Sequence, residues 1–202
     1  MPTIYKLKPA FQQLLRPLVG ALVRWGATAN QVTVAAVVLS AAVGGCILAW
    51  PEARWPLLLL PAALFVRMAL NAIDGMMARE HGMSTRLGAV LNEMGDVVSD
   101  TLLYLPLARV AGFDGLLVAC AVVLAVMTEM VGVVAVQIGA TRRYDGPMGK
   151  SDRAFAFGAL GLVLGLGVPA GQWLTWVLVA VCLLSVATVV NRARNGLREV
   201  EE

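Results

Sequence analysis

Long apolar segments separated by short polar ones dominate this chain. Six of these segments are close to the length of about 20 residues that a helix needs to cross the hydrocarbon core of a bilayer. The pattern therefore predicts an all-α integral membrane protein with six transmembrane helices. The predicted spans cover residues 31–50, 56–79, 87–110, 115–140, 153–169 and 172–192.

The segment before the first predicted span has a different pattern. Across residues 4–25, apolar side chains recur at helical spacing and basic side chains lie between them. This pattern is typical of an amphipathic helix that lies in the membrane interface. Residues 26–30 offer a break and an N-cap, so we expect this helix to end before span one. We predict a single membrane domain over 1–202, with a six-helix bundle at 31–192 and a cytoplasmic tail at 193–202.

The composition agrees with a membrane location. Of the 202 residues, 59% are hydrophobic and 14% are charged, and the mean hydropathy is +0.77. About a quarter of the residues are charged in an ordinary soluble domain. The net charge of +3 is modest, and we expect no nucleic-acid partner.

Basic residues are distributed unevenly between the two sets of loops. Basic loop residues mark the cytoplasmic side of a membrane protein. With an even number of spans, the distribution predicts that both termini lie in the cytoplasm. One side carries Lys6, Lys8, Arg16, Arg24, Arg79, Arg86, Arg142, Arg143, Lys150, Arg153, Arg192, Arg194 and Arg198, and the other side carries Arg54 and Arg109.

Two clusters of polar residues interrupt the second and third predicted spans. Ionisable residues inside a membrane are energetically costly, so their presence indicates a functional site. A short loop joins the two spans, which would bring Asp74 and Asp96 to a comparable depth. The polar residues that share one helical face are Asn71 and Asp74 on the second span, and Asn92, Asp96 and Asp100 on the third.

These side chains predict a cation site built from oxygen atoms. Oxygen ligands suit Mg²⁺ or Mn²⁺ better than zinc or copper. Arg79 lies about one turn beyond Asp74, at the predicted membrane edge. Carboxylates, a divalent ion and a nearby arginine can together hold and polarise a diphosphate. The candidate metal ligands are Asp74, Asp96, Asn71, Asn92 and Asp100.

The spacing of these residues resembles the signature of the CDP-alcohol phosphotransferase family. That signature reads D-x2-D-G-x2-A-R, followed after eight or nine residues by G-x3-D-x3-D. The segment 28–33 is also similar to the family's entry to its first span. The residues that match the signature in identity and spacing are Asp74, Gly75, Ala78, Arg79, Gly88 and Asp96.

The resemblance implies a transferase that moves a phosphoalcohol group from a CDP-alcohol to a hydroxyl acceptor and releases CMP. It implies CDP-diacylglycerol as the donor, an alcohol acceptor of unknown identity, one or two Mg²⁺ or Mn²⁺ ions, and a homodimer in a bacterial inner membrane. By position, Asp74 would bind metal near the diphosphate, and Asp96 would be the catalytic base. The residues that would lie along the CDP moiety are Gly75, Ala78, Arg79, Gly88 and Asn30.

Two positions depart from the family signature. Its first and third aspartates are Asn71 and Asn92 in this chain. Four carboxylates carry enough negative charge to balance two divalent ions, whereas two carboxylates balance only one. Either a single ion binds, or Glu93 and Asp100 supply further negative charge to the metal site. The chain is similar to a bacterial branch of the family with the same asparagines. A non-catalytic CDP- or lipid-binding homologue and an ion-coupled transporter remain alternatives, because intramembrane acids also mark ion paths.

Basic residues before the fifth predicted span are candidates for binding the acceptor or its phosphate. They are Lys150, Arg153 and Arg142, the first of which follows a glycine that exposes its backbone. The alternative is that they only anchor the loop on the cytoplasmic side.

Arg67 and Glu129 lie deep inside the second and fourth predicted spans. A buried ion pair between them is one interpretation. In the other, Arg67 neutralises Asp100 or Asp74, and Glu129 faces a dimer interface or a cavity on the lipid side.

Overall fold

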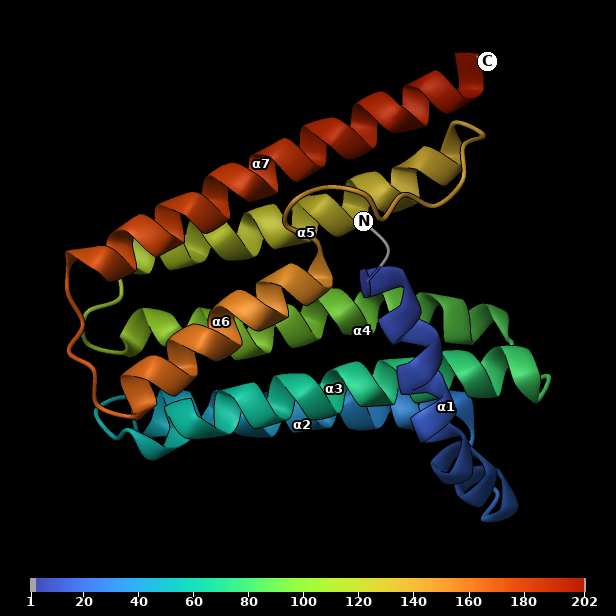
Figure 1. Ribbon diagram of the computed structural model, residues 1–202, viewed down its shortest axis with the longest axis horizontal. Coiled ribbons are helices and arrows are strands. Elements are labelled where there is room, and N and C mark those ends of the chain that lie inside the picture. Colours follow the sequence, from blue (N-terminus) through green and yellow to red (C-terminus); the bar gives the residue numbers. More distant parts are fainter. Residues whose placement is uncertain (1–2, 202) are drawn as a thin grey trace.

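The computed structural model describes residues 3–201, and their side chains from residue 9 onward. Over this range the chain is all-helical, as the hydropathy pattern predicts. Its elements are α1 (Thr3–Arg24), α2 (Ala29–Ala49), α3 (Trp55–Glu80), α4 (Arg86–Tyr104), the 3-10 helix η1 (Leu105–Arg109), α5 (Gly115–Gln137), α6 (Lys150–Gly165) and α7 (Gln172–Glu201), as Figure 1 shows.

Local signals in the sequence set the start of the first long helix. Gly26 adopts a φ of +77°, a left-handed conformation that glycine tolerates well and that ends α1. Thr28 then caps α2, because its hydroxyl accepts a hydrogen bond from the Gln31 backbone N–H at 3.3 Å. The Gln31 side chain returns a bond to the Thr28 N–H at 2.9 Å, which completes a capping box. The predicted break at residues 26–30 is confirmed.

The helices form two groups, which contact each other where α5 packs against α4 and η1. α2 packs against both α3 and α4, and α5 packs against α7. α6 packs against α3 and crosses between the two groups in Figure 1. α1 crosses one end of α2 and α3 and buries Val19 against them. The helix predicted at 4–25 is therefore present, while its place in the membrane interface stays a prediction.

Four of the helices are long and apolar enough to cross a membrane, judged by length and composition alone. They are α2, α3, α5 and α7. α6 has 16 residues, fewer than the roughly 20 that a bilayer core requires. α4 carries several charged residues, among them Asp96 and Asp100. The count of six spans therefore stays a prediction.

Two predicted boundaries are wrong. The third span does not run as one helix to residue 110, since α4 ends at Tyr104 and η1 follows. Pro106 explains the change, because proline cannot donate the backbone hydrogen bond of an α-helix interior. The fifth helix begins at Lys150, three residues earlier than predicted. α7 continues through the segment from residue 193 as far as Glu201, and the cytoplasmic location of this segment stays a prediction.

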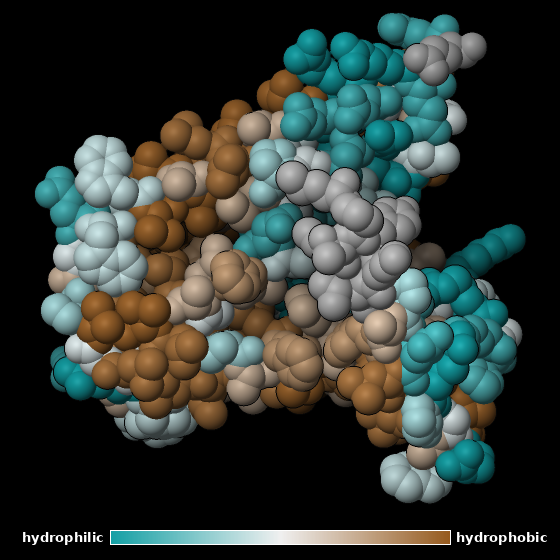
Figure 2. Space-filling view, in the orientation of Figure 1, coloured by the Kyte–Doolittle hydropathy of each residue, from teal (hydrophilic) through white to brown (hydrophobic). Residues whose placement is uncertain are grey.

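The surface separates into apolar and polar regions. In Figure 2, hydrophobic residues cover much of the visible face over α3, α6 and the first part of α7. Hydrophilic residues gather at the end of the molecule that carries the C-terminal part of α7 and the loop between α3 and α4. This is the end that the basic residues predict to be cytoplasmic.

α2 and α4 approach closely at Gly44, which leads to a testable prediction. A Cβ atom at Gly44 would lie 1.8 Å from the carbonyl oxygen of Leu102 on α4. We expect Gly44→Ala to lower the free energy of unfolding by about 1–3 kcal/mol, as overpacking does in other cores. Gly45→Ala is the matched control, because a Cβ there meets nothing within 4 Å. Thermal unfolding in detergent measures the difference, and equal melting temperatures for the two variants would contradict the prediction.

Candidate active site

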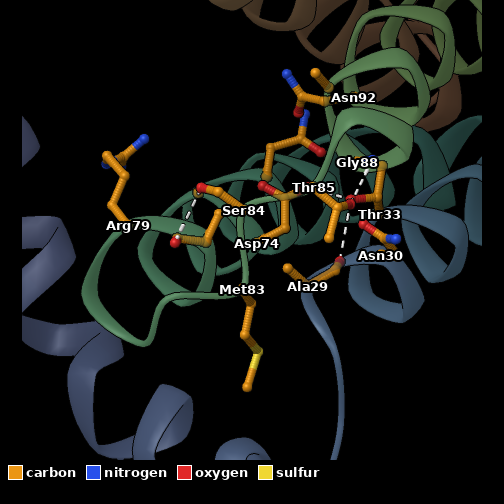
Figure 3. A pocket seen from close by; sticks show the side chains of 14 residues that line it. Ala29, Asn30, Thr33, Asp74, Arg79, Met83, Ser84, Thr85, Gly88 and Asn92 are labelled. Carbon is orange, nitrogen blue, oxygen red and sulfur yellow. Dashed lines mark hydrogen bonds between the residues drawn. The ribbon is translucent and has the colours of Figure 1, made fainter.

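A cavity of about 340 Å³ lies between α2, α3, α4 and the loop that joins α3 to α4. Figure 3 shows Asp74 near the middle of its lining, with Thr33 and Asn30 to one side and Arg79 to the other. The structure brings most of the predicted site residues to this one cavity. Those that line it are Asn30, Asn71, Asp74, Gly75, Ala78, Arg79, Gly88 and Asn92.

Asp74 is held in place by α2. Its side chain is buried, and its Oδ2 atom accepts a hydrogen bond from the Thr33 hydroxyl at 2.7 Å. The same hydroxyl lies 3.1 Å from the carbonyl oxygen of Ala29. Thr33 thus fixes the orientation of the carboxylate, a role that the sequence did not reveal. The signals in the sequence were a polar residue inside the apolar α2 and its position in the segment 28–33, which resembles the family's entry to its first span.

Asp96 lies beside the cavity and connects three helices. Its Oδ1 atom accepts a hydrogen bond from the Asn71 side chain of α3 at 3.0 Å. The same oxygen forms an ion pair with the ammonium group of Lys150, the first residue of α6. Arg67 Nη2 lies 3.6 Å from it and donates to the Asp96 carbonyl oxygen at 3.0 Å. Because Asn71 lines the cavity, Asp96 is linked to the cavity through the Asn71 side chain.

Two glycines leave room for polar side chains at the cavity. A Cβ atom at Gly88 would lie 2.7 Å from the Asn30 side-chain oxygen. A Cβ atom at Gly75 would lie 3.1 Å from the Arg79 guanidinium. Small residues at these positions therefore allow Asn30 and Arg79 to approach the helix backbone, which favours a role in the site over helix packing alone.

The loop between α3 and α4 adds residues that sequence reasoning missed. Thr85 caps α4 by accepting a hydrogen bond from the Gly88 N–H at 2.9 Å. Ser84 donates to the carbonyl oxygen of Ala78 at 3.1 Å. These adjacent hydroxyls were visible in the sequence as an N-cap signal for a helix. The lining residues that were not predicted are Ala29, Thr33, Met83, Ser84, Thr85 and Ala89.

Asp100 lies one turn deeper than Asp96 and away from the cavity. Its Oδ1 atom pairs with Arg67. Its Oδ2 atom accepts hydrogen bonds from Arg153 Nε at 3.1 Å and Nη2 at 3.0 Å. Both carboxylate oxygens are therefore engaged by guanidinium groups, and the structure does not present Asp100 as a metal ligand. The interpretation in which Arg67 neutralises Asp100 is correct.

Glu129 is the second carboxylate of this buried network. The prediction that it pairs with Arg67 is wrong, and it does not face a lipid-side cavity, since its side chain is buried. Arg153 and Arg142 each approach it to 3.0 Å, and Arg192 of α7 lies 3.6 Å away. Arg192 was not predicted to belong to any site.

Two of the three basic candidates are thus engaged elsewhere. Arg142 pairs with Glu93 at 2.8 Å as well as with Glu129. Burial lowers the pKa of Arg142, but the hydrogen bonds to these two carboxylates outweigh this effect and raise the pKa above its ordinary value. Arg153 is fully buried. Of the three, Lys150 alone contacts a motif carboxylate within the described residues.

The donor set fits a divalent cation. Two carboxylates, Asp74 and Asp96, lie near the carboxamides of Asn71 and Asn92, and such oxygen ligands suit Mg²⁺ or Mn²⁺. Within residues 9–201 no group of three or more histidine, cysteine, aspartate or glutamate side chains gathers into a metal site. Carboxamide oxygens or substrate oxygens would therefore have to complete the coordination.

The all-helical membrane fold and the polar cavity define a class of protein, and comparison with known protein families identifies that class. The CDP-alcohol phosphatidyltransferase family model matches residues 26–187, and the chain belongs to this family. The family resemblance of the motif is confirmed. The matched region contains the whole cavity, and the apolar helices make the chain a multi-pass membrane protein.

Individual relatives show how far the similarity extends. The inner membrane protein YnbA of Escherichia coli (strain K12) is 45% identical over 199 residues, which cover 96% of each chain. The phosphatidylinositol phosphate synthase of Mycobacterium marinum is 28% identical over 194 residues, covering 91% of this chain and 78% of the relative.

Solved structures show the same fold. A crystal structure of the Mycobacterium tuberculosis phosphatidylinositol phosphate synthase with CDP-DAG bound has a TM-score of 0.75 and 23% identity, covering 93% of this chain and 94% of that one. A second structure of that enzyme, in complex with manganese and citrate, has the same TM-score and covers 90% of this chain and 88% of that one.

Proposed function

We propose that this protein transfers a phosphatidyl group from CDP-diacylglycerol to the hydroxyl of an alcohol acceptor and releases CMP. The observation that carries the proposal is the convergence of the motif residues on one cavity, with Asp96 linked to it through Asn71. Membership of the CDP-alcohol phosphatidyltransferase family and a related enzyme with bound CDP-DAG support this donor.

A second cavity supports a lipid donor. It is a groove of about 490 Å³ between α3 and α6, and its lining is almost entirely apolar. Ser151, beside Lys150, belongs to the same lining. An acyl chain could therefore lie in this groove while the diphosphate stays near Asp96. The other lining residues are Pro61, Leu64, Phe65, Met68, Ala154, Phe155, Gly158, Ala159 and Leu162.

In the proposed reaction, the acceptor oxygen attacks the β-phosphorus of the donor, and the bond from that phosphorus to the CMP oxygen breaks. Asp96 takes the proton of the acceptor hydroxyl as a general base. Arg79, at the rim of the cavity, stabilises negative charge on the departing CMP. A divalent ion held mainly by Asp74, with the carboxamide oxygens of Asn71 and Asn92, would neutralise charge on the diphosphate.

The membrane arrangement follows from the same proposal. The six helices from α2 to α7 span a bacterial inner membrane, α1 lies in its interface, and both termini are cytoplasmic. The gathering of hydrophilic residues at one end of the molecule supports this orientation, and the relative from Escherichia coli is named an inner membrane protein. The cavity then opens where CDP-alcohols and Mg²⁺ are available. The homodimer that the family resemblance implies is retained as part of the proposal.

One observation favours a second function, a CDP- or lipid-binding protein without catalysis. Because Asn71 and Asn92 replace two aspartates, only two of the four acidic positions of the motif carry a carboxylate.

Mass spectrometry of the lipids decides between the two functions. Protein in nanodiscs is incubated with CDP-diacylglycerol, Mg²⁺ or Mn²⁺, and a pool of soluble cell metabolites. The transferase predicts a new phospholipid whose mass identifies the acceptor, and none with Asp74→Asn. Binding of CDP-diacylglycerol without a new phospholipid would favour the non-catalytic binding protein. If neither binding nor product is found, the ion-coupled transporter becomes the favoured hypothesis.

A substitution at Gly88 tests whether Asn30 contacts the donor. Because a Cβ at Gly88 would meet the Asn30 side chain at 2.7 Å, Gly88→Ala should displace Asn30 from the cavity. We expect the KM for CDP-diacylglycerol to rise about tenfold, equivalent to about 1.4 kcal/mol, with a smaller change in kcat. Steady-state kinetics measure this effect, with Gly45→Ala as the control. An unchanged KM would contradict the prediction that Asn30 contacts the donor.

A further inference from the structure

The two acidic motif residues have different electrostatic surroundings. Among the ion pairs of residues 9–201, none involves Asp74, and its Oδ2 atom is bound by the neutral hydroxyl of Thr33. Asp96, in contrast, pairs with Lys150 and lies 3.6 Å from the guanidinium of Arg67. Within the described residues, paired cations are therefore found at Asp96 and not at Asp74.

The position of Lys150 is fixed by the protein scaffold. It is the first residue of α6, and the N–H of the preceding Gly149 donates to Asp152 Oδ2 at 2.9 Å. The N–H of Met148 donates to the Thr188 hydroxyl of α7 at 2.8 Å. One turn further along α6, Arg153 is fixed by the buried network. The backbone of Lys150 is therefore held from both sides by these hydrogen bonds.

The motif of this chain carries less negative charge than the family signature. Asn71 and Asn92 stand where the family signature has aspartates, so two negative charges are absent. Asn71 donates its amide to Asp96 Oδ1, the atom that also accepts from Lys150. That oxygen is engaged by a neutral donor and a cation, and a divalent ion there would meet a like charge, which is unfavourable.

We infer that the ammonium group of Lys150 acts as a protein-borne cation at Asp96 in place of a second divalent ion, so that the site holds a single Mg²⁺ or Mn²⁺. Asp74, which no cation of the described chain pairs with, is the main carboxylate for that ion. The two asparagines then reduce the negative charge of the site to what one divalent ion and the Lys150 ammonium group require. This inference rests on the proposed function, since it assigns the cations of the same site.

Manganese binding to the purified protein tests the inference without substrate or turnover. Free Mn²⁺ is titrated by electron paramagnetic resonance in detergent, which gives the number of ions for each chain and their affinity. We expect one ion for each wild-type chain. In Lys150→Ala we expect Mn²⁺ to bind about tenfold more tightly, because a like charge beside Asp96 has been removed.

Two further variants keep the test decisive. Lys150→Gln removes the charge but can still donate a hydrogen bond to Asp96, so it serves if the alanine variant fails to fold, and the same tighter binding is expected. Arg143→Ala removes a positive charge from the loop before α6, at a residue that pairs with Asp145 and Glu199 instead of Asp96. Its Mn²⁺ affinity should equal that of the wild type.

Two ions for each wild-type chain, or an unchanged or weaker affinity in both Lys150 variants, would overturn the inference. Such a result would leave the proposed transferase intact, because product formation is measured separately. Conversely, a chain that binds one ion and forms no phospholipid would contradict the proposed function while the assignment of Lys150 stands.

Discussion

Replacing Asp96 with alanine should lower CMP release about 1,000-fold, within the range that general acid–base catalysis contributes. Asp96 is the carboxylate that connects α3, α4 and α6 at the edge of the cavity. Without it the acceptor hydroxyl has no base, and both Asn71 and Lys150 lose their partner. The measurement is the rate of CMP release from CDP-diacylglycerol in the presence of the pool of soluble cell metabolites.

The variant should remain folded, since the Asp96 side chain is 18% exposed and Lys150, its ion-pair partner, is 25% exposed. Thermal unfolding checks this point. Glu93→Gln is the matched control on the same helix, because Glu93 pairs with Arg142 and not with the motif residues. If CMP release by Asp96→Ala stays within tenfold of the wild-type rate, Asp96 is not the general base.

Glu129→Gln should be the most destabilising single substitution in the buried network. Three guanidinium groups, from Arg142, Arg153 and Arg192, lie within 3.6 Å of this carboxylate. Glutamine keeps the shape of the side chain but removes its charge, which leaves these arginines without a shared counterion. Breaking a buried ion pair in this way costs about 3–5 kcal/mol. The melting temperature in detergent should therefore fall clearly.

Glu93→Gln also serves as the control for stability. Glu93 binds the same arginine, Arg142, but its side chain is 34% exposed. Exposed ion pairs contribute about 0–1 kcal/mol, so its removal should change the melting temperature little. If both variants unfold at the same temperature, the network around Glu129 does not stabilise the fold.

Most of the fold could be predicted because its signals are local. Helix starts such as the capping box at Thr28 depend on neighbouring residues, and the apolar spans depend on composition. The spacing of Asp74 and Asp96 within the motif also placed both acids on adjoining helices. The wrong boundary before residue 110 had a local signal too, since Pro106 interrupts the predicted span.

The partners of the buried charges could not be predicted in the same way. Glu129 of α5 binds Arg153 of α6 and Arg192 of α7, so its environment depends on which helices pack together. Apolar spans have similar patterns whatever their neighbours, and the sequence therefore allowed Arg67 to pair with Glu129 or with Asp100. The hydrogen bond from Thr33 to Asp74 joins residues 41 positions apart, for the same reason.

The central claim is that this chain transfers a phosphatidyl group, and the most direct measurement counts both products. Purified protein is incubated with CDP-diacylglycerol, Mn²⁺ and the pool of soluble cell metabolites, and CMP and new phospholipid are quantified in the same sample. Transfer predicts equal molar amounts of the two products, and about 1,000-fold slower formation of both with Asp96→Ala. CMP released without matching phospholipid, or no CMP from a protein that binds the donor, would contradict the account.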